Sequence, residues 1–167
     1  YHGLYLSAVK AQAVLLEQAE LFEEMQDICQ QASALDGLDE GLHTLIVRSL
    51  LRQGRDTAAL AHYEKATDLL YRNLGVRPSE ELRALFSQLI GQPVDESFAL
   101  FPPFHTDCGK NIHIGKNVFL NMGCKFQDQG GIVLGDGALI GHNVVLATLN
   151  HDEDPARRHI LHPAPII

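Results

Sequence analysis

The stretch from Ile112 to Leu146 reads IHIGKNVFLNMGCKFQDQGGIVLGDGALIGHNVVL and repeats with a period of six residues. Large or apolar side chains recur at this spacing, with one step of eight residues, at Cys108, Ile114, Leu120, Phe126, Leu134, Ile140 and Leu146. A small or polar residue follows most of them. This pattern is typical of a left-handed parallel β-helix, in which each six-residue unit forms one flat face. An alternating β-sheet has a period of two and would not keep this register.

The corners of such a coil need backbone with positive φ. The Gly-Lys-Asn turn at 115–117 and the Gly-Asp-Gly turn at 135–137 supply it, because glycine and asparagine adopt positive φ at little cost. In the step of eight residues the coil is interrupted, and we expect the loop Gln127 to Gly131 to be extruded there.

Composition and charge bound the class of protein. The chain has 167 residues and a net charge of −8, which argues against a general nucleic-acid binder. It shows no apolar run of the roughly 20 residues that cross a membrane and no signal-peptide pattern. The three cysteines lack metal-binding spacing. Cys108 and Cys124 fall on inward positions of the repeat, which predicts small core residues in a reducing cytoplasm and leaves a regulatory thiol as the alternative.

The first ninety residues are rich in Ala, Leu, Glu and Gln and predict helices. We expect them near residues 4–18, 20–34, 38–53, 56–73 and 79–90. One apolar stripe is predicted at Leu4, Ala8, Ala11 and Leu15, and another at Ile46, Val47, Leu50 and Leu51. Ser79 is a predicted N-cap, followed by two glutamates that favour the positive end of the helix dipole. Ala32 and Ala66 are separated by the 34 residues of a tetratricopeptide repeat, which predicts TPR-like helical hairpins.

Two segments of this half carry a family resemblance. The run from Ala58 to Ala66, AALAHYEKA, and the run from Leu70 to Leu85, LYRNLGVRPSEELRAL, resemble the bacterial transcriptional activator domain of antibiotic-regulatory-type activators. The resemblance covers about residues 1–88. In that family the DNA-reading part precedes this segment. The resemblance therefore implies that residues 1–88 contact a protein or sense an effector and do not bind nucleic acid directly. A plain helical scaffold is the alternative.

From about Ser79 the chain also resembles the maltose/galactoside O-acetyltransferases of the hexapeptide acyltransferase family. The matching segments are GQPVDESF at 91–98, FPPF at 101–104, DCGKNIHIG at 107–115, VFLNM at 118–122, IGHNV at 140–144 and TLNHDEDPARR at 148–158. The resemblance implies acetyl-CoA as co-substrate, a sugar-like hydroxyl acceptor, and a homotrimer with active sites between subunits.

Acetyl transfer to a hydroxyl needs a base. A thioester is already activated, so no metal and no covalent intermediate are required, and a neutral imidazole suits the task near neutral pH. His151 ends a regular coil and opens the polar loop from Asp152 to His162, where a rigid backbone can present a reactive side chain. The family's general base maps onto His151. The alternative is a solvated loop histidine.

Two further positions match acceptor-binding residues of the family. Asn121 matches the acceptor-binding Asn of the family. A carboxamide can both donate to and accept from sugar hydroxyls, which suits that role. The alternative is a corner Asn whose side chain bonds to the local backbone. Asp128 matches a family Asp in the loop 127–131, with a turn-forming Asp as the alternative. No residue can be assigned to coenzyme A, and no metal site is predicted.

These observations predict an α+β chain with TPR-like helical hairpins at 1–90 and a truncated left-handed parallel β-helix at 91–167. The coil is expected to be incomplete, because it resumes only at residues 165–167 and the family's later coils, which carry most coenzyme A contacts, do not follow. The predicted function is acetyl-CoA-dependent O-acetylation of a sugar-like hydroxyl, or a remnant of that activity. The alternative is a regulatory, protein-interaction module in which the helices act and the β-helix is a passenger.

Overall fold

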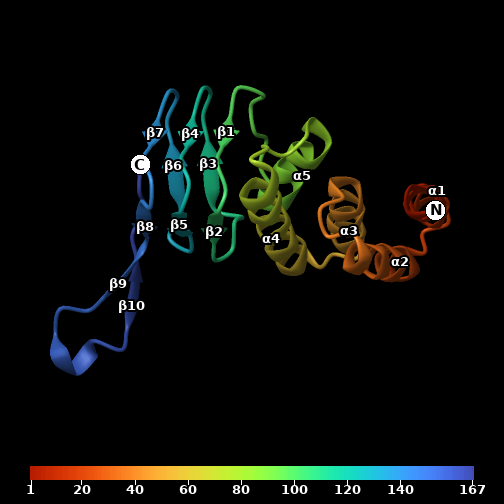
Figure 1. The fold of residues 1–167 in the computed structure, drawn as a ribbon. Helices are drawn as coiled ribbons and strands as arrows, with labels where there is room; N and C mark the ends of the chain where they lie inside the picture. Colours follow the sequence, from red (N-terminus) through yellow and green to blue (C-terminus); the bar gives the residue numbers. More distant parts are fainter. The chain divides into compact units, whose positions relative to one another are not determined.

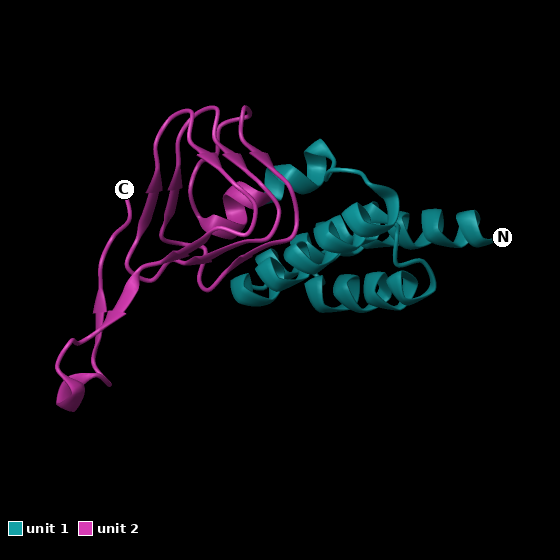
Figure 2. Ribbon diagram, turned by 60° about the vertical axis from the view of Figure 1, so that its left-hand side comes forward, with its two compact units in different colours: residues 1–85 teal, residues 86–167 magenta.

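The computed structural model describes all residues 1–167 and divides into two compact units, Tyr1–Leu85 and Phe86–Ile167 (Figure 2). Five helices lie in the order predicted: α1 His2–Gln18, α2 Phe22–Leu35, α3 Glu40–Arg52, α4 Asp56–Leu74 and α5 Glu80–Ile90 (Figure 1). None of them is both long and apolar enough to cross a membrane.

Local signals explain where the helices begin and end. The Asp39 carboxylate accepts from the Leu42 amide at 3.1 Å and caps α3. The Ser79 hydroxyl accepts from the Leu82 amide at 3.3 Å, so the predicted N-cap of α5 is confirmed. Gly75 ends α4 with φ 67°, a left-handed conformation that glycine adopts without strain.

The first unit packs α1 on α2, α2 on α3 and α3 on α4. Ala32 and Ala66 are fully buried and let neighbouring helices approach closely. Ile46, Val47 and Leu50 are also buried, which confirms three residues of the predicted stripe of α3, whereas Leu51 is only half-buried. The TPR-like arrangement itself stays a prediction.

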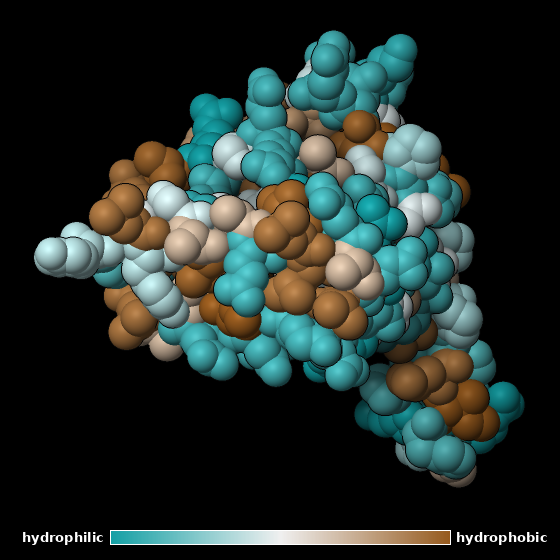
Figure 3. All heavy atoms as spheres, turned by 90° about the vertical axis from the view of Figure 1, so that its right-hand side faces the viewer, coloured by the Kyte–Doolittle hydropathy of each residue, from teal (hydrophilic) through white to brown (hydrophobic).

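The predicted stripe of α1 is wrong. Leu4 and Leu15 are 74% and 65% exposed, whereas Leu6, Val9 and Ala13 form the buried face. Both sets have helical spacing, so periodicity alone could not choose between them. Hydrophobic side chains therefore remain at the surface on the side that carries the N-terminus in Figure 1 (Figure 3).

The second unit is a three-sided coil of parallel strands. One sheet contains β1 Ala99–Leu100, β4 Phe119–Leu120 and β7 Leu139–Ile140; the second contains β2 Phe104–Thr106, β5 Cys124–Gln127 and β8 Val145–Ala147; the third contains β3 Ile112–Ile114 and β6 Ile132–Leu134. Neighbouring strands of the first sheet pair at 20 residues, Ala99 with Phe119 and Phe119 with Leu139. The predicted parallel coil is therefore present, and its left-handedness stays a prediction.

The interior of the coil follows the repeat. Leu120, Phe126 and Leu134 are buried, and the ring of Phe126 meets Phe104 edge-on with centroids 5.1 Å apart. At the first coil, Phe86 from the end of α5 stacks on Phe98 at 5.5 Å. The predicted corners are confirmed, because φ is positive at Asn117 (55°), Gly137 (74°) and Asn143 (56°).

Cys108 is not an inward residue. The strand register places Thr106 opposite Phe126, so Thr106 holds the position that the repeat assigned to Cys108. The step of eight residues recurs at the same corner in both coils, from Thr106 to Ile114 and from Phe126 to Leu134. Cys108 lies exposed in that corner, whereas Cys124 is buried as predicted.

A longer excursion interrupts the third coil. Strands β9 Leu149–His151 and β10 Leu161–Pro163 pair antiparallel, and a 3-10 turn at Pro155–Arg157 lies between them. This hairpin, residues 149–163, is called the arm below, and it projects away from the coil (Figure 1). The chain rejoins the third sheet where Ile166 pairs with Ile132.

Candidate functional site

The arm carries His151 at the end of β9, on an exposed position. The ring atom Nδ1 lies 2.7 Å from the carbonyl oxygen of Arg158. A carbonyl can only accept, so in the neutral ring Nδ1 holds the proton and Nε2 keeps its lone pair. The geometry therefore leaves Nε2 as the atom that can take a proton from another molecule.

Two aspartates shape the arm beyond His151. The Asp152 carboxylate contacts Arg157 Nη2 at 3.1 Å and His162 Nε2 at 3.2 Å, which joins the turn to β10. Its other oxygen accepts from the Asp154 amide at 2.9 Å. Asp154 in turn caps the 3-10 turn by accepting from the Ala156 amide. The hydrogen bonds of this turn thus hold the Arg158 carbonyl oxygen next to His151.

Asn121 lies in the turn that follows β4. Its Oδ1 accepts from the Met122 amide at 2.9 Å, and its own amide donates to Ile140 in the next coil. This residue is half-buried, and its Nδ2 group donates no hydrogen bond within the chain. One part of Asn121 therefore orders the corner while the other part can meet a ligand.

Asp128 is fully buried at the corner after β5. Its Oδ1 accepts from the Thr106 hydroxyl at 2.8 Å and from the Cys108 amide at 2.9 Å, and its Oδ2 accepts from the Asn111 amide at 3.1 Å. Desolvation raises the pKa of this carboxyl, but the hydrogen bonds, led by that of Cys108, outweigh it and hold the pKa below its ordinary value. Asp128 thus orders the corner of the preceding coil. These hydrogen bonds favour the alternative of a turn-forming Asp.

The structure brings together some of the predicted site residues and separates others. Asn121 precedes strand β5 and Asp128 follows it, so the two residues lie at opposite ends of that strand. The Thr148 amide donates to Gln127, which places the base of the arm at the Asp128 end. A four-residue strand spans roughly 13 Å, so Asn121 and His151 do not belong to one compact cluster within a single chain.

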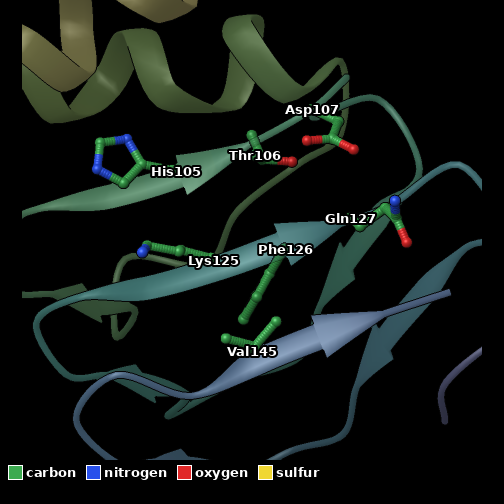
Figure 4. A pocket seen from close by; sticks show the side chains of 7 residues that line it. All are labelled: His105, Thr106, Asp107, Lys125, Phe126, Gln127 and Val145. Atoms are coloured by element: carbon green, nitrogen blue, oxygen red, sulfur yellow. The ribbon is translucent and has the colours of Figure 1, made fainter.

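A shallow pocket of about 220 Å³ lies on the outer surface of the sheet β2-β5-β8. Figure 4 shows the side chains that line it, His105, Thr106, Asp107, Lys125, Phe126, Gln127 and Val145. Gln127 also accepts from the Leu149 amide at 3.3 Å, which connects the pocket rim to the base of the arm. The sequence analysis missed His105, Lys125 and Val145 because they lie at outward positions of the repeat, which show no pattern of their own.

Comparison with known proteins finds a family for the helical half and similar proteins for the coil half. A family model described as the bacterial transcriptional activator domain matches residues 1–90, so the chain belongs to that family. The predicted resemblance of the helical half is therefore confirmed.

The coil half is similar to a nodulation protein and to several acetyltransferases. Nodulation protein L of Rhizobium meliloti is 42% identical over 57 residues, which cover 34% of this chain and 31% of that protein. Galactoside O-acetyltransferase of Escherichia coli is 33% identical over 84 residues, covering 50% of this chain and 41% of that enzyme. The chain thus spans 31% to 41% of the length of these two relatives.

Solved structures point the same way. A hexapeptide-repeat acetyltransferase of Vibrio cholerae has 27% identity and a TM-score of 0.54, covering 67% of this chain and 61% of that protein. The same enzyme has been solved in complex with acetyl coenzyme A. The predicted resemblance to hexapeptide-repeat acetyltransferases is therefore confirmed.

Proposed function

We propose that the coil half transfers an acetyl group from acetyl-CoA to a hydroxyl of a sugar-like acceptor. The hydrogen bond from His151 Nδ1 to the Arg158 carbonyl carries the proposal, because it leaves Nε2 free as a base. The acetyltransferases among the relatives supply the reaction type.

With acetyl-CoA as the donor, the reaction requires only a base from the arm. Acetyl-CoA would supply an acyl group that is already activated as a thioester, so the protein needs a base rather than a nucleophile of its own. His151 Nε2 takes the proton as the acceptor hydroxyl attacks, and the resulting imidazolium can return a proton to the departing thiol. The Arg158 carbonyl keeps its hydrogen bond to Nδ1 throughout and holds the ring in place.

Asn121 is the proposed acceptor-binding residue. Its Nδ2 group can donate to a hydroxyl of the acceptor while Oδ1 stays with the Met122 amide. The acceptor contact of Asp128 stays a prediction, and the hydrogen bonds around that carboxylate favour a role in holding the corner.

We propose a homotrimer through the coil, in which His151 of one copy and Asn121 of another meet. The separation of the two residues along β5 supports this arrangement, since one chain does not bring them together. A left-handed β-helix is the form of coil that this proposal assumes.

Incubation with acetyl-CoA and a panel of acceptors tests the proposed function. We expect thiol release that depends on the acceptor, with sugars as substrates and their O-methylated forms inactive. Mass spectrometry should find one acetyl ester per thiol released. Thiol release at the same rate with and without any acceptor would contradict the proposal.

The helical half supports a second candidate function. Its membership of the bacterial transcriptional activator domain family favours contact with a protein partner. The exposed apolar residues of α1, including Leu4 and Leu15, are the surface that such contact would cover first. Substituting both with serine should weaken capture of a partner without changing acetyl transfer.

A further inference from the structure

Thr148 lies where the chain leaves the coil to form the arm, and its side chain is fully buried. The hydroxyl donates to the carbonyl oxygen of Gln127 at 2.5 Å and accepts from the Gly130 amide at 2.7 Å. Both partners belong to the corner of the preceding coil. The hydroxyl is therefore fully used, as a buried polar group must be.

The backbone of Thr148 ties down the other leg of the arm. Its carbonyl accepts from the Ala164 amide at 2.7 Å, just after β10 ends. One residue thus fixes the point where the arm departs and the point where it returns. The register continues from there, because Leu149 pairs with Pro163 and His151 pairs with Leu161.

Gly130 shows how closely the corner and the base of the arm approach. A Cβ at this position would lie 2.7 Å from the Thr148 carbonyl oxygen and 3.0 Å from the Ala164 amide nitrogen. Any side chain would push both legs of the arm away from the corner. Gly135 is a matched control in the same coil, since a Cβ there meets nothing within 4 Å.

We propose that Thr148 is a positioning residue that fixes the ring of His151. This role rests on the proposed function, in which His151 is the base. The hydrogen bonds of the Thr148 hydroxyl and backbone, called the Thr148 clamp below, set the register of β9 against β10. That register brings the Arg158 carbonyl to Nδ1 of His151. Thr148 touches no substrate in this account; it acts through the hydrogen bond that selects the tautomer.

A purely structural role for Thr148 makes a different prediction. It would lower the melting temperature of the coil and leave the imidazole of His151 unchanged in the protein that remains folded. The two roles are therefore separated by the tautomer of His151, which ¹⁵N NMR of the imidazole rings reports without any substrate. His151→Gln assigns the resonance.

The test uses the full chain with Thr148→Val, which replaces the hydroxyl by a methyl group, and Thr148→Ser, which keeps it. In the wild type and in Thr148→Ser we expect the Nδ1–H tautomer of His151. In Thr148→Val we expect a mixture of both tautomers. The kcat for acetyl transfer should fall about 10- to 100-fold with the KM for acetyl-CoA nearly unchanged, as for a misplaced reacting group.

Gly130→Ala keeps the proposal testable if Thr148→Val does not fold. It should produce the same mixture of tautomers, whereas Gly135→Ala should retain the wild-type spectrum. A wild-type tautomer in both folded Thr148→Val and Gly130→Ala would overturn the proposal, and so would an Nε2–H ring in the wild type. Altered tautomers in a protein without acetyl transfer would uphold the positioning role and refute the proposed function.

Discussion

The two halves satisfy their buried polar side chains in different ways. In the helices, Thr44, Ser49 and Thr67 donate to backbone carbonyls three or four residues away. In the coil, Asp128 and Thr148 bond to groups 17 to 22 residues away, one coil earlier. These three hydroxyls thus bond within their own helix, whereas in the coil Asp128 and Thr148 hold the corners from which the site residues project.

Replacing Asp128 by alanine should have the largest effect on stability. Several donors of the preceding corner would lose their acceptor, and each lost hydrogen bond to a charged group costs about 1.5–3 kcal/mol. We expect the free energy of unfolding of the coil to fall by at least about 3 kcal/mol. Urea unfolding followed by the phenylalanine bands of the near-UV circular dichroism spectrum measures it, because all four tyrosines lie in the helical half.

Thr67→Ala is the matched substitution in the helical half. It removes a local hydrogen bond whose acceptor, the Glu64 carbonyl, is already part of a helix, so its cost should be about 1 kcal/mol. An Asp128→Ala protein as stable as the wild type would show that the carboxylate serves an acceptor rather than the corner.

Acidification should act on the helical half through His62. Burial, with smaller contributions from His43 and Lys65, lowers the pKa of His62 to about 4 from 6.5. Below pH 6.5 the unfolded chain binds a proton that the folded chain does not, so stability is lost as the pH falls from 6.5 toward 4. His62 also lies 3.1 Å from His43 Nδ1, and glutamine can keep a donor there.

Urea midpoints at pH 7 and pH 5 check this prediction. The drop in the far-UV midpoint should be smaller in His62→Gln than in the wild type. His142→Gln, at an exposed corner of the coil, should keep the full drop. Equal drops in all three proteins would mean that His62 titrates normally in the folded helices.

Asn121→Ala should have a smaller and more selective effect on the coil. The loss of one hydrogen bond, about 0.5–1.5 kcal/mol, corresponds to a rise of about 2- to 10-fold in the KM for the acceptor. The KM for acetyl-CoA should change less. Asn111→Ala, an exposed asparagine at another corner, is the control. Equal changes in both KM values would remove Asn121 from the acceptor site.

Much of the fold could be predicted from the sequence because it depends on short-range periodicity. The helices, the N-cap at Ser79 and the positive-φ corner at Asn117 all depend on residues that are neighbours in the sequence. The prediction was wrong for Cys108 because the repeat looked interrupted once, whereas the structure repeats the step of eight residues at each coil.

The site was only partly predictable for a related reason. His151 could be proposed because a family motif surrounds it, but its tautomer depends on Arg158, which reaches it through the arm. Thr148 carried a weak signal: it lies two residues beyond the inward Leu146, where strand alternation predicts a buried side chain. That a threonine occupies this buried position could have suggested a polar clamp.

The central claim is that His151 is the base for acetyl transfer, and His151→Ala in the full chain tests it most directly. The measurement is the initial rate of acetyl ester formation at saturating acetyl-CoA and acceptor. We expect the rate to fall about 10²- to 10⁴-fold, the usual contribution of general base catalysis, with an unchanged melting temperature. His142→Ala should keep the wild-type rate. A His151→Ala rate within about threefold of the wild type would contradict the account.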